Sequence, residues 1–233
     1  MNDLIFRKAQ PNDIEEIIGF TQNTFQWGDY VPKAIHEWVR EGKAYVALMN
    51  GKVVAVAAIT LVERAAYLHG MRVRPENRRT GIGEAMTRFL IEESRRLGAE
   101  IVTLLVAEWN TPSLNLVHKV GFKEALEVYG GVPTRVKPTK CLSPEEAVGA
   151  LEEALRSTGG FACLPDDPWT CVRASPQLLL SRALPCVGRG GLYVGRFSFG
   201  AAYMDVDGDA VALSTEGFVD NYGKFYLLYY ALN

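Results

Sequence analysis

The feature that most constrains the fold is a turn with two glycines, Arg78-Arg79-Thr80-Gly81-Ile82-Gly83. It follows an apolar strand predicted over residues 66–73. After the turn, apolar residues recur at helical spacing from Ile82 to Leu90 and predict an amphipathic helix that ends near Gly98. The start of such a helix offers unpaired backbone N–H groups and the positive end of the helix dipole. The turn is therefore suited to bind an anionic group such as a phosphate.

The residue types within the turn are suited to a diphosphate. Gly81 and Gly83 have no side chains, so backbone amides can approach a ligand closely. Arg78 and Arg79 add positive charge and forked donors for phosphate oxygens. A dinucleotide-binding turn needs a third glycine where Met86 stands, and a P-loop needs Gly-Lys-Ser/Thr, which this turn does not contain.

Helical and strand patterns alternate around the turn. Asn12-Asp13-Ile14-Glu15 resembles a capping box at the start of a helix, and Asn50-Gly51 is typical of a hairpin turn. The predicted elements are strands at 4–8, 44–49, 53–61, 66–73, 101–107, 122–128 and 134–136, and helices beginning near 14, 32, 82 and 111. This order predicts an α/β fold.

A short linker, Lys137-Pro138-Thr139-Lys140, divides the chain into two predicted domains. The first domain covers residues 1–137. The second, residues 138–233, begins with the strong helix start Ser143-Pro144-Glu145-Glu146 and mixes short helices with short strands. We interpret it as a small α+β domain without a catalytic motif of its own.

Composition excludes several function classes. The net charge of -2 and the pI near 6.0 argue against a nucleic-acid-binding protein. No apolar run reaches the roughly 18 residues of a membrane helix, and the N-terminus does not resemble a secretory signal, so we expect a cytoplasmic protein without a membrane partner. A monomer and a homodimer both remain open.

The four cysteines all lie in the second half of the chain and form no CxxC pair, so we expect no metal site. Buried, reduced thiols are the preferred interpretation for a cytoplasmic protein. The alternative is a disulfide between Cys163 and Cys171, which flank a predicted turn.

The pattern Arg-x-x-Gly-x-Gly, preceded by Val73-Arg74-Pro75, resembles the coenzyme A signature of the GNAT family of N-acetyltransferases. A second set of residues resembles that family's other signature: Asn110, Ser113, Leu116, Lys119 and Gly121-Phe122. The resemblance covers roughly residues 4 to 136. It implies the GNAT fold, in which helices flank a mixed, mostly antiparallel central sheet, and it implies acetyl-CoA as the cofactor.

The resemblance also implies which residues contact acetyl-CoA. The pantetheine arm would run along Met71, Arg72 and Val73 in the manner of an added strand. The diphosphate would be held by residues of the turn and of the first helical turn: Arg78, Arg79, Thr80, Gly81, Ile82, Gly83 and Glu84. Asn110 and Ser113 would help to hold the cofactor. The alternative for Asn110 is a turn residue that ends a strand.

Three side chains are candidates for proton transfer. His69 is the best candidate for a general base, because histidine titrates near neutral pH and this one lies two residues before Met71. Its surroundings also resemble the region where serotonin N-acetyltransferase places a histidine base. Glu63 and Glu108 could relay the proton through water. The alternatives are a half-buried structural histidine and two solvent-facing carboxylates.

The chain departs from the family at Val117, where many members have a tyrosine that protonates the leaving thiolate. Valine cannot donate a proton. The first hypothesis is therefore an N-acetyltransferase that acts by direct attack in a ternary complex. The alternative is an acyl-CoA-binding sensor or regulatory module without turnover.

The predicted acceptor is a small primary amine. Trp27, Asp29 and Tyr30 form an acidic and aromatic set that suits a cationic amine, or else simply pack their loop. A faint similarity to histidine N-acetyltransferases, which carry a C-terminal extension, favours a free amino acid or similarly small amine. The C-terminal domain could then close over the acceptor site.

Overall fold

The computed structural model describes residues 4–25 and 28–232, and these form two compact units. The first unit runs up to residue 102 and adds residues 116–121 and the chain's end from 231. The second comprises residues 103–115 and 122–230. These units are defined by their compactness, which does not test where a family's domain begins or ends. The predicted division into 1–137 and 138–233 stays a prediction.

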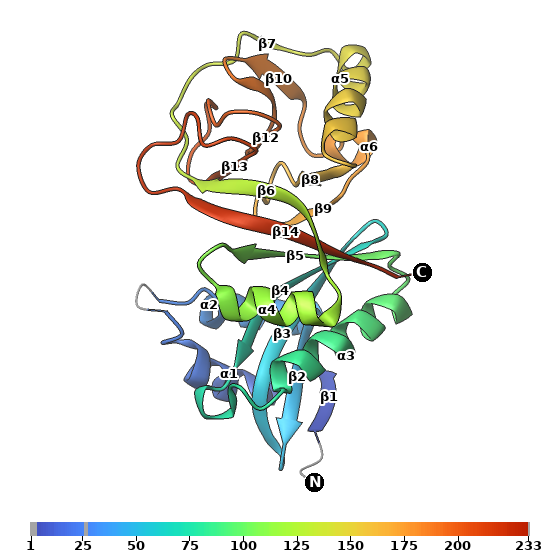
Figure 1. The fold of residues 1–233 in the computed structure, drawn as a ribbon, viewed down its shortest axis with the longest axis vertical. Helices are drawn as coiled ribbons and strands as arrows, with labels where there is room; N and C mark the ends of the chain where they lie inside the picture. Colours follow the sequence, from blue (N-terminus) through green and yellow to red (C-terminus); the bar gives the residue numbers. More distant parts are fainter. Residues whose placement is uncertain (1–3, 26–27, 233) are drawn as a thin grey trace. The chain divides into compact units, whose positions relative to one another are not determined.

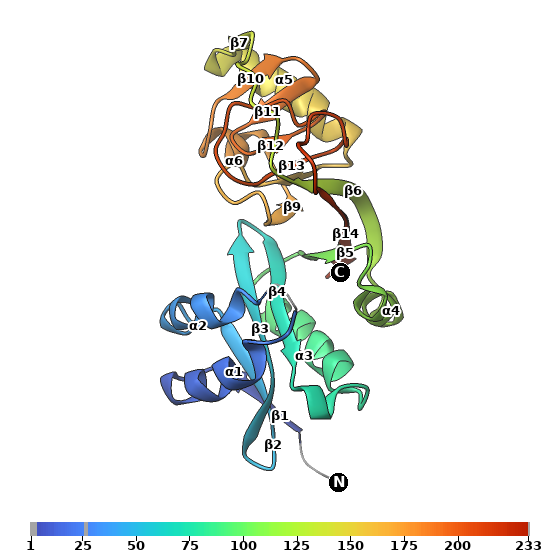
Figure 2. The ribbon, with the colours of Figure 1, turned by 90° about the vertical axis from the view of Figure 1, so that its left-hand side faces the viewer.

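The first unit is an antiparallel sheet with helices on both faces. Its strands follow the order of the chain: β1 (Leu4–Lys8), β2 (Ala44–Met49), β3 (Lys52–Val62) and β4 (Ala65–Val73). Its helical elements are η1 (Pro11–Asp13), α1 (Ile14–Thr21), α2 (Val31–Arg40), η2 (Pro75–Asn77) and α3 (Ile82–Arg96). Figure 2 shows α1 and α2 on one face of the sheet and α3 on the other.

The predicted hairpin between β2 and β3 is confirmed. Met49 pairs with Lys52, so Asn50 and Gly51 alone form the turn. Both have positive φ angles, 53° and 75°, as a two-residue turn of this kind requires. This tight connection fixes the register of the two central strands.

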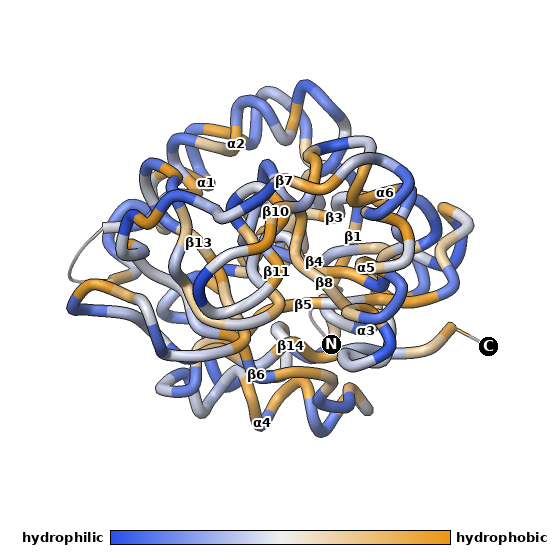
Figure 3. Tube along the Cα trace, turned by 90° about the horizontal axis from the view of Figure 1, so that it is seen from above, coloured by the Kyte–Doolittle hydropathy of each residue, from blue (hydrophilic) through white to orange (hydrophobic). Residues whose placement is uncertain are grey.

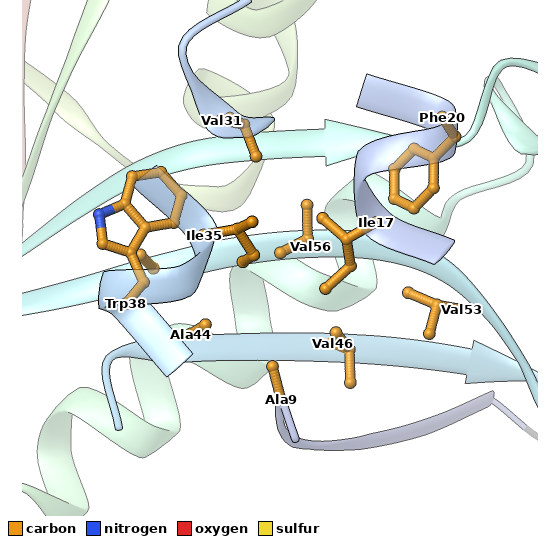
Figure 4. Close-up of a cluster of buried hydrophobic side chains, with 11 residues drawn as sticks. Ala9, Ile17, Phe20, Val31, Ile35, Trp38, Ala44, Val46, Val53 and Val56 are labelled. Atoms are coloured by element: carbon orange, nitrogen blue, oxygen red, sulfur yellow. The ribbon is translucent and has the colours of Figure 1, made fainter. Parts of the chain in front are cut away.

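Helices α1 and α2 bury apolar side chains against the sheet. Figure 4 shows Ile17 of α1 and Ile35 of α2 beside the side chains of Val46 and Val56 on β2 and β3, and Phe20 and Trp38 belong to the same cluster. Figure 3 shows hydrophilic and hydrophobic segments alternating along both helices, as expected of helices with one buried face. This core supports the central strands from the side that carries His69.

The second unit contains a longer sheet. Its strand order is β5-β14-β6-β13-β12-β11-β10-β7, and only β12 and β13 among the registered pairs run parallel. The strands are β5 (Ile101–Ala107), β6 (Lys123–Gly131), β7 (Lys140–Cys141), β10 (Pro185–Gly188), β11 (Gly191–Val194), β12 (Phe197–Ser198), β13 (Ala210–Ala212) and β14 (Gly223–Ala231). The other elements are α4 (Thr111–Val120), α5 (Pro144–Ser157), α6 (Pro176–Leu180) and the pair β8 (Phe161–Cys163) and β9 (Cys171–Arg173).

The strand beside β6 comes from the C-terminal end of the chain. Figure 1 shows β14 lying along β6, and residues 223–229 pair with residues 123–130. The strand predicted at 134–136 is wrong. Pro133 and Thr134 form only isolated bridges, to Phe218 and Tyr203. Strand β14, and not a strand at 134–136, therefore pairs with β6.

The preferred interpretation of the cysteines as reduced thiols is also wrong. Cys163 is joined to Cys171 across β8 and β9, and Cys141 to Cys186 across β7 and β10. Each pair lies directly opposite in an antiparallel register, which brings the two side chains together. The first of these was the alternative from the sequence, and the second was not foreseen.

Among the described residues, no helix combines the length and the apolar character needed to cross a membrane.

Candidate active site

The turn after β4 has an unusual backbone that its own side chains stabilise. Arg79 and Gly81 both have positive φ angles, 63° and 87°. The Arg78 Nε donates to the carbonyl of Val73 at 3.2 Å, and the Thr80 hydroxyl donates to the carbonyl of Asn77 at 2.6 Å. These bonds close the turn and bring the chain into α3 at Gly81, its N-cap residue.

The N-terminus of α3 presents backbone donors without a side-chain cap. Gly81 makes no side-chain capping bond, and the first backbone bond of the helix runs from the Ala85 N–H to the Gly81 carbonyl. The amides of residues 82–84 thus precede the helical ladder and point out of the helix end. A Cβ built on Gly81 would meet no atom within 4 Å. Open space, directed amides and a positive dipole fit a diphosphate.

One negative side chain lies in this first helical turn, and its charge is compensated. The Glu84 carboxylate binds Lys119 Nζ at 2.6 Å and Arg88 at 3.0 Å. Hydrogen bonds from Lys119 and then Arg88 hold the pKa of Glu84 below its ordinary value. The carboxylate therefore stays ionised beside two cations, which leaves the local charge favourable to an anion.

Gly83 is also closely packed. A Cβ at this position would lie 2.9 Å from Cδ1 of Leu116 on α4 and 3.7 Å from Cγ2 of Val73. The sequence suggested only that a glycine here lets a ligand approach. The contacts show that Gly83 also lets α4 approach α3 closely.

Strand β4 contains a bulge just before its end. Val56 pairs with Arg72 but Ala58 pairs with His69, so Ala57 faces both Gly70 and Met71. Gly70 has a φ angle of 65°, and a Cβ there would lie 2.5 Å from the ring of Trp38. Bulges leave one residue out of the ladder and commonly occur beside active sites. The contacts of Met71, Arg72 and Val73 with a cofactor arm stay predictions.

The Asp29 carboxylate, expected to attract a cationic amine, is instead paired inside the protein. It accepts from Nε and Nη2 of Arg72 at 2.5 and 3.0 Å, and from the backbone N–H of Val31 at 2.9 Å. Its side chain is 0% exposed and that of Arg72 is 13% exposed. Burial acts to raise the pKa of Asp29, but the bonds from Arg72, Val31 and Thr24 outweigh it and lower the pKa. These contacts attach the loop to β4.

Of the other two residues expected at the acceptor site, Tyr30 is about half exposed (52%). Its ring meets Trp38 edge-on with centroids 5.9 Å apart, and the Arg72 guanidinium lies 5.5 Å from its centroid. Trp27 lies outside the described residues. Trp38, which the sequence analysis did not predict at the site, contacts both Tyr30 and His69.

His69 is half-buried on β4 and surrounded by three side chains of the first unit. Its Nε2 lies 2.9 Å from the Thr60 hydroxyl on β3. The Trp38 ring meets the imidazole edge-on at 4.8 Å, and the Tyr67 ring stacks on it at 5.6 Å. Thr60 and Tyr67 were not foreseen, although strand alternation places Tyr67 and His69 on the same face.

The two candidate glutamates lie in very different places. Glu63 is exposed in the hairpin turn between β3 and β4, at the opposite end of β4 from the cofactor turn. Proton transfer is expected at His69, in the middle of this nine-residue strand, and the role of Glu63 as a relay stays a prediction. Glu108 follows β5 in the second unit, where it binds Lys224 at 3.2 Å and accepts from Tyr226 at 3.4 Å.

Asn110 caps helix α4. Its carbonyl accepts from the N–H groups of Ser113 and Leu114 at 3.0 and 3.1 Å, and its side-chain oxygen lies 3.4 Å from the Ser113 N–H. These are the bonds of an N-cap residue. Val117, on the same helix, is buried at 5% exposure. The cofactor contacts of Asn110 and Ser113 stay predictions.

Comparison with known proteins shows what this chain is similar to. Residues 13–122 match the sequence model of the Acetyltransferase (GNAT) family. The chain is 24% identical over 170 residues to the human "Probable N-acetyltransferase 16", covering 70% of this chain and 44% of that protein. It is 31% identical over 91 residues to a histidine N-acetyltransferase of Xenopus tropicalis, covering 37% and 28%. The chain thus spans less than half the length of these two curated relatives.

A solved structure resembles the fold over nearly the whole chain. It is that of a proposed acetyltransferase from Thermoplasma acidophilum, with a TM-score of 0.63, 22% identity and coverage of 97% of this chain and 99% of that one. The likeness extends through the second unit as well as the first. Residues 13–122 are thus similar in sequence to the GNAT family of acetyltransferases, and the fold is similar to that of this solved structure over nearly the whole chain.

Proposed function

We propose that the protein is an acetyl-CoA-dependent N-acetyltransferase that acetylates a primary amine by direct attack in a ternary complex. The observation that carries the proposal is the N-terminus of α3, where the backbone amides face open space at Gly81. The preceding strand, β4, carries His69, which lies nine residues before Arg78 in the chain. Amides 82–84 would hold the diphosphate, with Arg78 and Arg79 adding charge. Bound acetyl-CoA would supply the acetyl thioester that the amine attacks.

In this proposal, His69 removes the proton that the amine must lose before or during attack. The half-buried imidazole lies on the face of β4 that α2 covers, beside the exposed Tyr30 at the start of α2. Glu63 and Glu108 remain candidate relays. The bulge at Gly70 and Met71 would turn backbone groups toward the reacting carbonyl.

For the acceptor, we propose a free amino acid or another small amine. The histidine N-acetyltransferases among the relatives favour a free amino acid. A third relative, the Escherichia coli [Ribosomal protein bS18]-alanine N-acetyltransferase, is 34% identical over 76 residues, covering 33% of this chain and 51% of that protein, and its name states a protein acceptor. A cytoplasmic location remains part of the proposal.

The buried Val117 favours one alternative, a module that binds acyl-CoA without turnover. Release of the CoA thiol distinguishes the two. Purified protein would be assayed with acetyl-CoA and a panel of free amino acids, polyamines and N-terminal peptides. Tight acetyl-CoA binding without thiol release on any acceptor would favour the sensor.

If an acceptor is found, we expect His69→Gln to lower kcat by about 100-fold, the usual contribution of a general base, with little change in the KM for acetyl-CoA. His36→Gln is the matched control, because His36 is exposed on α2. Equal rates in wild type and His69→Gln would remove His69 from the mechanism.

A further inference from the structure

Thr60 and His69 are bonded across neighbouring strands. In the register of β3 and β4, Thr60 pairs with Tyr67 and Ala58 with His69. Thr60 and His69 are thus diagonal neighbours on one face, a separation that side chains can bridge. The Thr60 Oγ1 lies 2.9 Å from the His69 Nε2, a hydrogen-bond distance.

Two aromatic rings restrict the orientation of the same imidazole. The Tyr67 ring is stacked on it with an interplanar angle of 17°, and the Trp38 ring meets it at 88°. Trp38 is also pressed against Gly70, where a Cβ would come within 2.5 Å of its ring. The imidazole therefore has little freedom to rotate, and Nε2 is the nitrogen directed at Thr60.

We propose that Thr60 is a positioning residue that keeps the neutral His69 protonated on Nε2. This rests on the proposed role of His69 as the base. A neutral imidazole carries one N–H, so a proton on Nε2 places the lone pair on Nδ1, the nitrogen that would take the proton of the amine. The Nε2–H donates to the Thr60 Oγ1.

The opposite arrangement, in which the Thr60 hydroxyl donates to Nε2, does not suit a base. It would fix the lone pair on Nε2 and would have to break when the imidazole became protonated. A bond donated by Nε2–H persists in the imidazolium and becomes stronger, because the donor then carries a positive charge. Thr60 would thereby stabilise the product of proton transfer.

Two substitutions separate this role from simple packing. Thr60→Val keeps the branched shape but removes the hydroxyl, and Thr60→Ser keeps the hydroxyl. We expect Thr60→Val to lower kcat on the order of tenfold, as for a misoriented catalytic group, with the KM for acetyl-CoA unchanged. Thr60→Ser should restore most of the rate. Equal rates in Thr60→Val and wild type, or an equal loss in both variants, would overturn the proposal.

A spectroscopic measurement tests the tautomer without any turnover. Long-range ¹H–¹⁵N correlation spectra of ¹⁵N-labelled protein report which ring nitrogen carries the proton. The chain has three histidines; His69→Gln assigns the signal of His69, and the exposed His36 and His118 serve as internal references.

We expect neutral His69 to carry its proton on Nε2, and this preference to weaken in Thr60→Val but not in Thr60→Ser. A proton on Nδ1 in the wild type would overturn the inference even if His69→Gln is inactive. If His69→Gln is fully active while the tautomer shift occurs, the role of His69 as base fails and the positioning by Thr60 stands.

Discussion

At the scale of single residues, Asp29 and Arg72 determine how the loop before α2 is held. The guanidinium binds both carboxylate oxygens and lies 5.1 Å from the centroid of the Phe25 ring and 5.5 Å from that of Tyr30. Asp29 also accepts from the Val31 N–H at the start of α2. One buried pair therefore joins the loop, the helix and the end of β4.

We expect Asp29→Asn to destabilise the protein by roughly 3 kcal/mol at pH 7, because it leaves the Arg72 charge without its partner. The pKa of Asp29 is lowered by folding, so its contribution is fully present above the unfolded value near 3.9 and is lost as the pH falls through the folded value. Urea unfolding of both proteins should show a difference that is largest at neutral pH and shrinks below about pH 4.

Glu37→Gln provides the control for this experiment. Glu37 pairs with Arg40 on the surface of α2, with 60% and 73% of the two side chains exposed. An exposed pair of this kind contributes at most about 0.5 kcal/mol. A pH-independent difference between wild type and Asp29→Asn would contradict the assigned role of the carboxylate.

The sequence could indicate His69 but not its partners. Strand alternation places His69 and Tyr67 on one face, but Thr60 and Trp38 come from other elements. Their proximity depends on the register of β3 with β4 and on where α2 packs. The ion pair of Asp29 could not be foreseen for the same reason, since its partner Arg72 lies 43 residues away in the chain.

At the scale of elements, the strand, turn and helix at 65–96 could be predicted almost fully. The apolar period, the glycines and the bordering arginines are local signals, so the position of the turn and of the helix after it could be predicted from sequence alone. The bulge at Gly70 could not be found, because it is defined by pairing with β3. The packing role of Gly83 likewise depends on α4, a separate element.

Two glycines at opposite ends of α3 allow a matched test of the turn. Gly81 and Gly98 have φ angles of 87° and 85°, and a Cβ at either would meet nothing within 4 Å. Alanine at either position should cost roughly 1–2 kcal/mol of stability through the left-handed backbone. In isothermal titration, Gly81→Ala should weaken CoA binding at least about tenfold, roughly 1.4 kcal/mol, whereas Gly98→Ala should not.

Equal effects of the two substitutions on CoA affinity would mean that the loss reflects stability and not contact with the ligand. The melting temperatures of both variants show whether the two substitutions lower the stability of the protein equally.

At the scale of the whole chain, the predicted elements become less accurate after residue 122. Up to that point hairpins and helices connect neighbours in sequence, which a local pattern can reveal. Beyond it, most strands have only two to four residues, and β7, β13 and β14 pair with strands distant in the chain. The disulfide between Cys141 and Cys186 spans 45 residues and follows from such pairing.

The two disulfides should differ in their response to reductant. Cys163 and Cys171 are fully buried (0% exposed), whereas Cys141 is exposed at the edge of the sheet and Cys186 is partly exposed. An attacking thiolate must reach the sulfur, so only the second pair is accessible in the folded protein. Mild reductant should release two thiols under native conditions and four in denaturant. Release of all four without unfolding would contradict this burial.

The central claim is that the N-terminus of α3 binds the diphosphate of coenzyme A. Isothermal titration of the wild-type protein with CoA, and in parallel with pantetheine, which lacks the diphosphate, tests it most directly. We predict saturable binding of CoA and binding of pantetheine at least about tenfold weaker. No heat of binding with CoA, or equal affinity for the two ligands, would contradict the account.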